Sequence, residues 1–293
     1  MGNPSYDHSV RRPALVILAL LVALALTACD VGRPWPDPPP ALHSQHALLM
    51  VGDSLVGQTD TELPAAFDRA GLDVDVIDAH VNASGLLGPV GDAPSALAWV
   101  QEQVAAHPEA GTVVVEWGGA CGIACDPTQP EYVPYGSPQF FAQWTANAHA
   151  VVDWLRAQGK LVVWVVTPPF GIDLAGGTTS QLRVDIAAQL AALDRTDFAV
   201  RAGGTTVDWS AALTNLLDQY RTDLVYDGAT HTVRTSDLVH LTLDGATRTS
   251  AWTVTPLADL WAAHPEAATS GALGASQVEV AGDPVTLDVP PGL

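Results

Sequence analysis

A serine near the start of the chain and an aspartate–histidine pair near its end have the types and spacing to carry chemistry. Ser54 lies in the Gly-Asp-Ser-Leu run at 52–55, and Asp237 and His240 stand three residues apart. A serine hydroxyl is a weak nucleophile until a base removes its proton, and a carboxylate orients that base. The three residues therefore indicate acyl transfer, with Ser54 as nucleophile, His240 as base and Asp237 as the group that orients the base.

Each of these roles has a rival explanation. Asp53 or Ser54 can instead cap a helix that begins after the apolar run. His231 is a rival base, with Asp227 four residues before it, but that segment is polar and turn-like and no apolar strand leads into it. His80, at the end of the second predicted strand, could line the site but is expected to be structural, and His107 and His149 are expected to lie at the surface without partners.

The two sequence blocks resemble those of the GDSL/SGNH hydrolase family, whose first block is Gly-Asp-Ser-Leu and whose last is Asp-x-x-His. Both stand intact here, at 52–55 and 237–240, and the resemblance covers roughly residues 46–261. It implies an SGNH-hydrolase, flavodoxin-like α/β fold that hydrolyses esters with a catalytic serine. No cofactor is expected, because the chain has no Gly-rich phosphate loop, paired His/Glu metal motif or nicotinamide fingerprint.

The resemblance also implies an oxyanion hole, which in this family usually has three donors. The first is the backbone N–H of the serine, here Ser54. The second is a glycine N–H from the second block, which corresponds best to Gly85, with Gly88 as runner-up. The third is an asparagine amide from a Gly-x-Asn-Asp block, but Ala120 stands at that position. An alanine side chain cannot donate a hydrogen bond, so the sequence departs from the family here.

The missing amide leaves several outcomes open. Losing one oxyanion donor typically lowers the rate about 100- to 1,000-fold. Asn82, near the same strand ends, or a backbone N–H of the loop at 121–125 is a candidate substitute; otherwise activity is low or the fold serves binding. The competing predictions are an ester hydrolase, an O-acyltransferase in which a sugar hydroxyl replaces water, and a non-catalytic glycan-binding lipoprotein.

The elements that must position these residues alternate between strand and helix patterns. An apolar run before Ser54 predicts a buried parallel strand, and open α/β sheets place their sites at the carboxyl ends of such strands. Further strands are predicted at 74–79, 112–117, 161–166 and 205–209, and helices at 93–106, 140–157, 186–193, 211–220 and from 246 to 261, where a break at Pro256 is an open question. The pattern predicts a three-layer α/β domain whose mostly parallel sheet has helices on both faces.

The N-terminus has the composition of an export signal. Two arginines at 11–12 precede an apolar run from 14 to 26, which is short for a membrane-spanning helix, and Leu-Thr-Ala-Cys ends at Cys29. This run resembles the bacterial lipobox, so we expect Cys29 to be lipidated and to hold the chain at the outer face of the cytoplasmic membrane or cell envelope. An ordinary secretory signal and an uncleaved anchor are the alternatives.

The sequence predicts four segments and one disulfide. Residues 1–28 are the signal peptide, 29–45 a proline-rich tether, 46–263 the hydrolase domain, and 264–293 a tail that is loosely ordered or contains edge strands at 277–280 and 285–289. Lipidation of Cys29 leaves two cysteines, Cys121 and Cys125, which could close a small disulfide loop in an oxidising compartment. Two free or buried thiols are the alternative, and the spacing does not indicate a metal site.

The charge of the chain restricts its partners. The formal net charge is -20, and removal of 1–28 makes it more negative because that segment holds two arginines and one aspartate. Such a surface repels phosphate backbones, which excludes nucleic acid as a partner. We expect a small ester or an acylated glycan as substrate and membrane contact through the lipid anchor only. The sequence does not determine the oligomeric state.

Overall fold

The computed structural model describes residues 30–40, 42, 45–171, 174–175, 181–182 and 184–265. Its centre is a five-stranded sheet in the order β2-β1-β3-β4-β7, in which every neighbouring pair is parallel. The strands are β1 (His46–Gly52), β2 (Val74–His80), β3 (Thr112–Glu116), β4 (Leu161–Val166) and β7 (Thr206–Asp208). The chain adds β2 on one side of β1 and all later strands on the other. The winding therefore reverses at β1, and open α/β sheets bind ligands at such a reversal.

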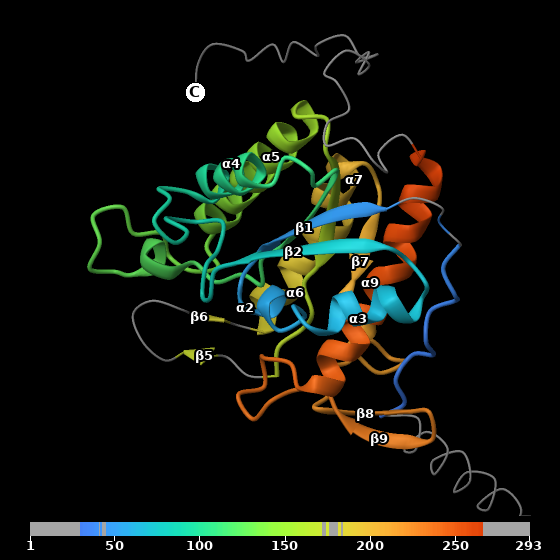
Figure 1. The fold of residues 1–293 in the computed structure, drawn as a ribbon. Coiled ribbons are helices and arrows are strands. Elements are labelled where there is room, and N and C mark those ends of the chain that lie inside the picture. The colour runs from blue at the N-terminus through green and yellow to red at the C-terminus, as the bar shows by residue number, and fades with distance from the viewer. Residues whose placement is uncertain are drawn as a thin grey trace, which may run out of the picture.

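Helices cover both faces of this sheet (Figure 1), so the predicted three-layer architecture is confirmed. One face carries α4 (Ala96–Ala106), α5 (Pro138–Ala157) and α7 (Ala199–Ala202), and the other carries α3 (Glu62–Arg69), α8 (Trp209–Ala212) and α9 (Leu243–Ala263). Because side chains alternate along a strand, β1 divides its residues between the two cores. Leu49 and Val51 face the first helix layer, whereas Leu48 and Met50 face the second.

The remaining elements are short and connect these layers. They comprise α2 (Ser54–Gly57), the 3₁₀ turn Gly122–Cys125, β5 (Leu174–Ala175), β6 (Gln181–Leu182), α6 (Val184–Leu193), a π-helical turn (Asp194–Phe198), β8 (Asp223–Tyr226) and β9 (Ala229–Thr232). The predicted disulfide between Cys121 and Cys125 is present, so that prediction is confirmed.

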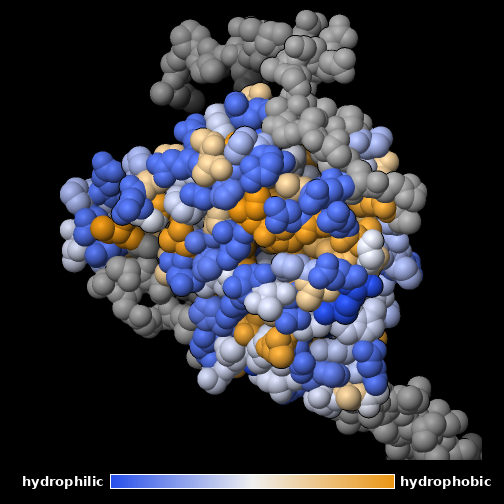
Figure 2. Space-filling model, viewed as in Figure 1, coloured by the Kyte–Doolittle hydropathy of each residue, from blue (hydrophilic) through white to orange (hydrophobic). Residues whose placement is uncertain are grey.

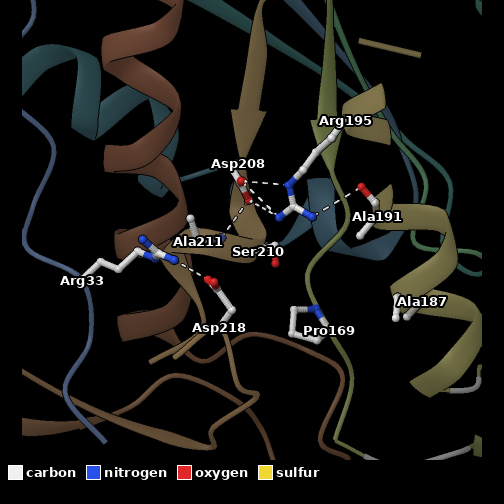
Figure 3. Close-up of a pocket in the computed structure, with 10 residues that line it drawn as sticks. Arg33, Pro169, Ala187, Ala191, Arg195, Asp208, Ser210, Ala211 and Asp218 are labelled. Carbon is white, nitrogen blue, oxygen red and sulfur yellow. Dashed lines mark hydrogen bonds and ion pairs between the residues drawn. The ribbon is translucent and has the colours of Figure 1, made fainter. Parts of the chain in front are cut away.

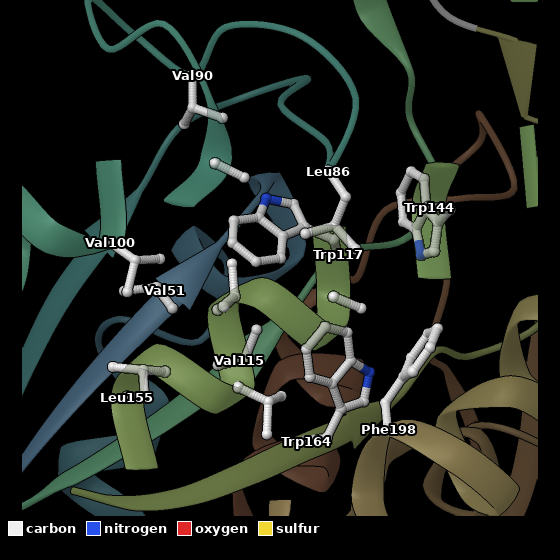
Figure 4. Packing of buried hydrophobic residues seen from close by; sticks show 14 of the residues in the cluster. Val51, Leu86, Val90, Val100, Val115, Trp117, Trp144, Leu155, Trp164 and Phe198 are labelled. Atoms are coloured by element: carbon white, nitrogen blue, oxygen red, sulfur yellow. The ribbon is translucent and has the colours of Figure 1, made fainter. Parts of the chain in front are cut away.

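Large aromatic side chains fill the core between the sheet and the layer of α4, α5 and α7, which we call the first core (Figure 4). Trp164 of β4 and Phe198 meet edge to face, with ring centroids 5.0 Å apart, and Trp144 of α5 packs against Phe140 at 5.4 Å. The indole N–H of Trp164 donates to the buried Asp194 at 2.8 Å, so the polar atom of this ring is satisfied inside the core. The face seen in Figure 2 is mainly hydrophilic, and hydrophobic residues reach it in a band at the level of β1 and β2.

Two predicted helices differ from the structure. The helix predicted at 211–220 is wrong beyond α8, because the side-chain oxygen of Asn215 accepts from the backbone N–H groups of Leu217 and Gln219 and closes a turn. The last helix, α9, has no break at Pro256. Val254 and Leu257, on either side of Pro256, are buried in the second core, between the sheet and the layer of α3, α8 and α9, and this packing maintains the helix although proline removes one backbone donor.

The segment around His231 is also different from the prediction. Strands β8 and β9 form an antiparallel hairpin, so a strand does lead into it. Asp227 and Gly228 make its two-residue turn with φ values of 53° and 75°, the left-handed conformation that matches the twist of a tight hairpin. The sequence pattern does not predict this strand, because Asp223–Tyr226 is short and half-exposed.

The predicted proline-rich tether is attached to the domain over part of its length. Val31 pairs with Val225 and Gly32 with Asn215, and Asp37 accepts a hydrogen bond from Thr255. The segment is extended, as proline requires, but it lies against the hairpin and α9. The predicted signal peptide, Cys29 and the tail strands at 277–280 and 285–289 lie outside the described residues. Within the described ranges, no helix is long and apolar enough to cross a membrane.

Truncating a buried leucine should test the layered core. Leu155 of α5 is fully buried, and Leu155→Ala should lower the free energy of unfolding by about 2–5 kcal/mol because it leaves a cavity. Leu217 is 61% exposed, so the matched change Leu217→Ala should alter it by less than about 0.5 kcal/mol. Urea unfolding followed by tryptophan fluorescence measures both. Equal effects would contradict the assignment of Leu155 to the core.

Candidate active site

Ser54 begins the short helix α2 directly after β1. The strand ends at Gly52, and the carboxylate of Asp53 caps α2 by accepting from the backbone N–H of Leu55 at 2.9 Å. A capping role in this segment and a chemical role for Ser54 are therefore compatible. Asp53 caps the helix, whereas the hydroxyl of Ser54 contacts His240. Gly52 leaves no room for a Cβ, which would lie 2.2 Å from the carbonyl oxygen of Glu116. Only glycine therefore allows the backbones of β1 and β3 to approach this closely here.

Ser54, His240 and Asp237, which we call the serine cluster, are joined by hydrogen bonds. The Oγ of Ser54 lies 2.9 Å from Nε2 of His240, and Nδ1 of His240 lies 2.6 Å from Oδ2 of Asp237. This is the arrangement in which an imidazole can take a proton from a serine while a carboxylate fixes its tautomer. The cluster is open to solvent, since the side chains of His240 and Asp237 are 35% and 42% exposed.

The carboxylate of Asp237 is held ionised by the loop around it. Burial alone would raise its pKa, but hydrogen bonds from Thr235, from His240 and from the backbone N–H groups of Val239 and His240 hold the pKa well below its usual range. Leu238 adopts a left-handed conformation with φ of 63° so that the loop closes on Asp237. Asp237 therefore carries the negative charge that a protonated His240 needs beside it.

Two residues that the sequence analysis did not identify hold this loop in place. Arg234 is 1% exposed, and its guanidinium donates to the carbonyl oxygens of Val239 and, at 2.9 Å, of Pro169. The side-chain oxygen of Gln58, at the end of α2, accepts from the backbone N–H of Leu241 at 2.8 Å. Gln58 thus ties the element that carries Ser54 to the loop that carries His240. No sequence pattern marks these residues, because their partners are backbone groups of distant segments.

A buried pair of carboxyl groups lies behind Ser54. Asp53 accepts from the backbone N–H of Gly118 at 2.9 Å, and its other neighbour is the fully buried Glu116 of β3. Burial, and next the charge of Asp53, raise the pKa of Glu116 well above its usual range. Since Asp53 already accepts two backbone N–H bonds and neither carboxyl oxygen of Glu116 has a hydrogen-bond partner, we assign the proton to Glu116. Burial likewise raises the pKa of nearby Asp194 to about 7.

The predicted second and third blocks meet near the end of β1. An ideal Cβ on Gly85 would lie 1.6 Å from the carbonyl oxygen of Ala120, so only glycine allows this contact. Ser84 accepts from the indole N–H of Trp117 at 3.2 Å and donates to the carbonyl of Gly52 at 3.3 Å. Both Gly85 and Ala120 are buried, whereas Asn82 is exposed in the turn after β2. Gly88 lies against the side chain of Ile123.

The other histidines considered above contact groups other than Ser54. His231 stacks on Tyr226, with ring centroids 3.9 Å apart, and its Nδ1 lies 3.2 Å from Asp244. The structure thus brings His240, and not the rival His231, to the serine. The expectation that His107 and His149 lack partners is wrong, because each ring approaches a carboxylate. The ring of His80 pairs with Asp78 at 2.7 Å and packs against Gly57.

A separate cavity of about 480 Å³ lies elsewhere on the domain, and none of the three residues of the serine cluster lines it (Figure 3). Two ion pairs and one proline are among its lining residues: Arg33 with Asp218, Arg195 with Asp208, and Pro169. The arginines are neutralised by their partners, so the cavity presents no net positive charge. Among the described residues, no group of His, Cys, Asp or Glu side chains could hold a metal ion.

Comparison with known proteins gives one family and several solved structures. The family described as a protein of unknown function (DUF459) matches residues 47–254, which hold Ser54, Asp237 and His240. A search of curated proteins gave no match.

The similar solved structures resemble this chain at low identity. A carbohydrate acetylesterase family member from Sinorhizobium meliloti is 17% identical with a TM-score of 0.48, covering 73% of this chain and 98% of that one. An esterase from Pseudoalteromonas sp. is 12% identical with a TM-score of 0.45, covering 73% and 98%. The periplasmic domain of a lipopolysaccharide acetyltransferase from Salmonella ser. Paratyphi A is 11% identical with a TM-score of 0.46, covering 82% and 88%. We argue function below from the residues of this chain.

Removing the ionisable proton of Glu116 should change how stability depends on pH. The unfolded chain releases this proton near pH 4.5, whereas the folded protein retains it to higher pH. Wild-type stability should therefore fall as pH rises through this window, by up to about 1.4 kcal/mol for each pH unit of it. Glu116→Gln keeps the size and shape of the side chain but cannot ionise. Its stability relative to wild type should thus increase with pH.

Urea unfolding from about pH 5 to about pH 9 measures this difference. The matched control is Glu131→Gln, because Glu131 is exposed to solvent, and its stability difference should be flat over the same range. A flat difference for Glu116→Gln as well would contradict the assignment of the proton to Glu116.

Proposed function

Since the chain belongs to the DUF459 family, a family of GDSL/SGNH-like acylhydrolases, we propose that it is a serine ester hydrolase that removes ester-linked acyl groups. The observation that carries the proposal is the 2.9 Å contact between Oγ of Ser54 and Nε2 of His240, with Asp237 on the other ring nitrogen. A serine in such a contact has both the base and the charge that its activation requires.

The proposed reaction has two steps. Nε2 of His240 takes the proton of Ser54 while Oγ attacks the ester carbonyl carbon, and the ionised Asp237 stabilises the imidazolium. His240 then gives this proton to the departing alcohol, which leaves an acyl group on Ser54. In the second step His240 takes a proton from water, whose oxygen attacks the acyl carbon. The acid departs, and Ser54 regains its proton.

The negative oxygen formed in each step needs donors. We propose the backbone N–H groups of Ser54 and Gly85, because the Gly85 segment is fixed against Ala120 and Gly52 beside the serine. Asn82 or a backbone N–H of the disulfide loop is the proposed replacement for the absent asparagine. Such donors act strongly because they are already in place when the charge develops.

The openness of the serine cluster supports a small acyl group carried on a large molecule. The side chains of His240 and Asp237 are more than a third exposed, and the cavity of about 480 Å³ described above is not lined by Ser54. We therefore propose an acylated glycan, with acetyl as the acyl group. The net charge of -20 disfavours carriers that are themselves polyanions.

We further propose export, with residues 1–28 as signal peptide, Cys29 as the lipidated residue and 46–263 as the hydrolase domain. The disulfide between Cys121 and Cys125 supports an oxidising compartment, because such bonds are rare where thiols are kept reduced. A non-catalytic glycan-binding role is the second candidate, and the observation that favours it is Ala120 at the position of an oxyanion donor.

Covalent labelling by a fluorophosphonate separates catalysis from binding. We expect labelling of Ser54 that Ser54→Ala abolishes, and a loss of ester turnover of about 10⁴-fold in His240→Ala, because the hydroxyl then lacks its base. The rival histidine provides the control, and His231→Ala should label as wild type does. A folded protein that neither labels nor turns over a small ester would favour the binding role. Adding a sugar acceptor to the assay distinguishes transfer from hydrolysis.

Restoring the asparagine tests the proposed oxyanion hole. If no other group donates, Ala120→Asn should raise turnover of p-nitrophenyl acetate by up to about 100- to 1,000-fold, because it adds one preorganised donor. Ala120→Leu controls for bulk without an amide. If Asn82 already donates, the gain should be small and Asn82→Ala should lower turnover instead. No change in either variant, with Ser54→Ala inactive, would show that the oxyanion hole lies elsewhere.

A further inference from the structure

The point at which the chain enters the described domain is fixed to its surface. The carbonyl oxygen of Asp30 accepts from the N–H of Val225 at 2.7 Å, and its side chain accepts from Arg221 at 2.9 Å. The next residue, Val31, accepts from the N–H of Leu216 at 2.9 Å, and the N–H of Gly32 donates to Val225 at 3.0 Å. Asp30 is therefore held beside β8 and the turn at 215–219, and not at the end of a free linker.

Exposed apolar side chains gather beside this entry point. The docking patch, as we call it, consists of Trp35, Leu216 and Leu217, which are 37%, 47% and 61% exposed. Trp35 and Leu216 line a largely apolar depression of about 450 Å³ together with Val31 and Tyr226. Leu217 is the next residue in the same turn. Large apolar side chains exposed together in this way mark a surface that is covered in the working protein.

Trp35 is held in the patch at a fixed orientation. Its indole N–H donates to Asp227 at 2.7 Å, its ring meets Tyr226 edge to face at 5.4 Å, and the guanidinium of Arg248 lies 5.1 Å from its centroid. A tryptophan with one satisfied polar atom and an exposed apolar ring suits a boundary between water and an apolar phase.

The sequence that precedes Asp30 identifies that phase. Residues 14–26 are continuously apolar, and Cys29, the proposed site of lipidation, is the residue directly before Asp30. Consecutive Cα atoms are about 3.8 Å apart, so a lipid on Cys29 would lie within reach of the docking patch. An uncleaved apolar anchor would place the bilayer beside Asp30 in the same way.

We propose that the docking patch rests on the surface of the lipid bilayer, with Trp35, Leu216 and Leu217 inserted at its interface. The inference depends on the anchoring in the proposed function but not on the catalytic role of Ser54. Three side chains bind a membrane weakly alone, but an anchor one residue away keeps them at high effective concentration beside it. Two acids next to the patch form ion pairs, Asp30 with Arg221 and Asp218 with Arg33, and a third, Asp227, accepts from Trp35 and interacts with the charge of Arg248, which reduces repulsion from headgroups.

The test uses the full-length protein, processed and lipidated in its host, reconstituted into phosphatidylcholine vesicles with brominated acyl chains. Bromine quenches tryptophans that enter the bilayer, and the contribution of Trp35 is the difference between wild type and Trp35→Phe. We expect the quenched fraction to fall at least about twofold in Trp35→Phe. Replacing both leucines, as Leu216→Gln with Leu217→Gln, should reduce quenching similarly because the patch then loses its apolar contact.

The matched control is Val200→Gln, which changes a residue of α7 that is 64% exposed outside the patch and should be quenched as wild type is. Turnover of a soluble ester should be equal in all variants, so a failure of the proposed catalysis appears separately. Protein that floats with vesicles but shows no quenching of Trp35 would overturn the inference. Protein that does not float would overturn it through the failure of anchoring. A detergent-soluble dimer that the leucine changes dissociate would assign the patch to a second copy instead.

Discussion

The buried carboxylate of Asp53 connects the ends of two central strands, and the candidate site depends on this connection. It accepts from the N–H of Leu55, in the first turn of α2, and from the N–H of Gly118, which follows β3. A carboxylate at 5% exposure needs such partners, because an unpaired buried charge is strongly unfavourable. The neutral carboxyl group of Glu116 is the other buried neighbour of Asp53. The position of Ser54 is therefore fixed from behind by groups that never meet substrate.

The loop that carries His240 is fixed by a second set of contacts. Arg234 and Gln58 bond to backbone groups of Val239 and Leu241, which lie on either side of the histidine. Backbone partners hold the loop in one conformation whatever side chains it presents. A serine and a histidine more than 180 residues apart in sequence thus meet at hydrogen-bond distance, because each element is tied to the sheet and to the other.

The first described residues of the chain have a structural role that a linker would not have. Their pairing with β8 and the turn after α8 turns the N-terminus into an additional edge of the domain. Ordinary tethers let a domain rotate freely over a membrane, whereas this attachment fixes one face toward whatever the N-terminus carries.

The sequence by itself determined the sheet, most of the helices covering it, and the identity of Ser54, Asp237 and His240 as the residues to bring together, because apolar periodicity and short motifs are local signals. It missed Arg234, Gln58 and Glu116, and it mistook the strand before His231 for a turn and the turn around Asn215 for a helix. Only the tertiary structure decided these points. Arg234 and Gln58 act on the backbone of residues brought near by folding, and the protonation of Glu116 follows from burial beside Asp53, which no local pattern encodes.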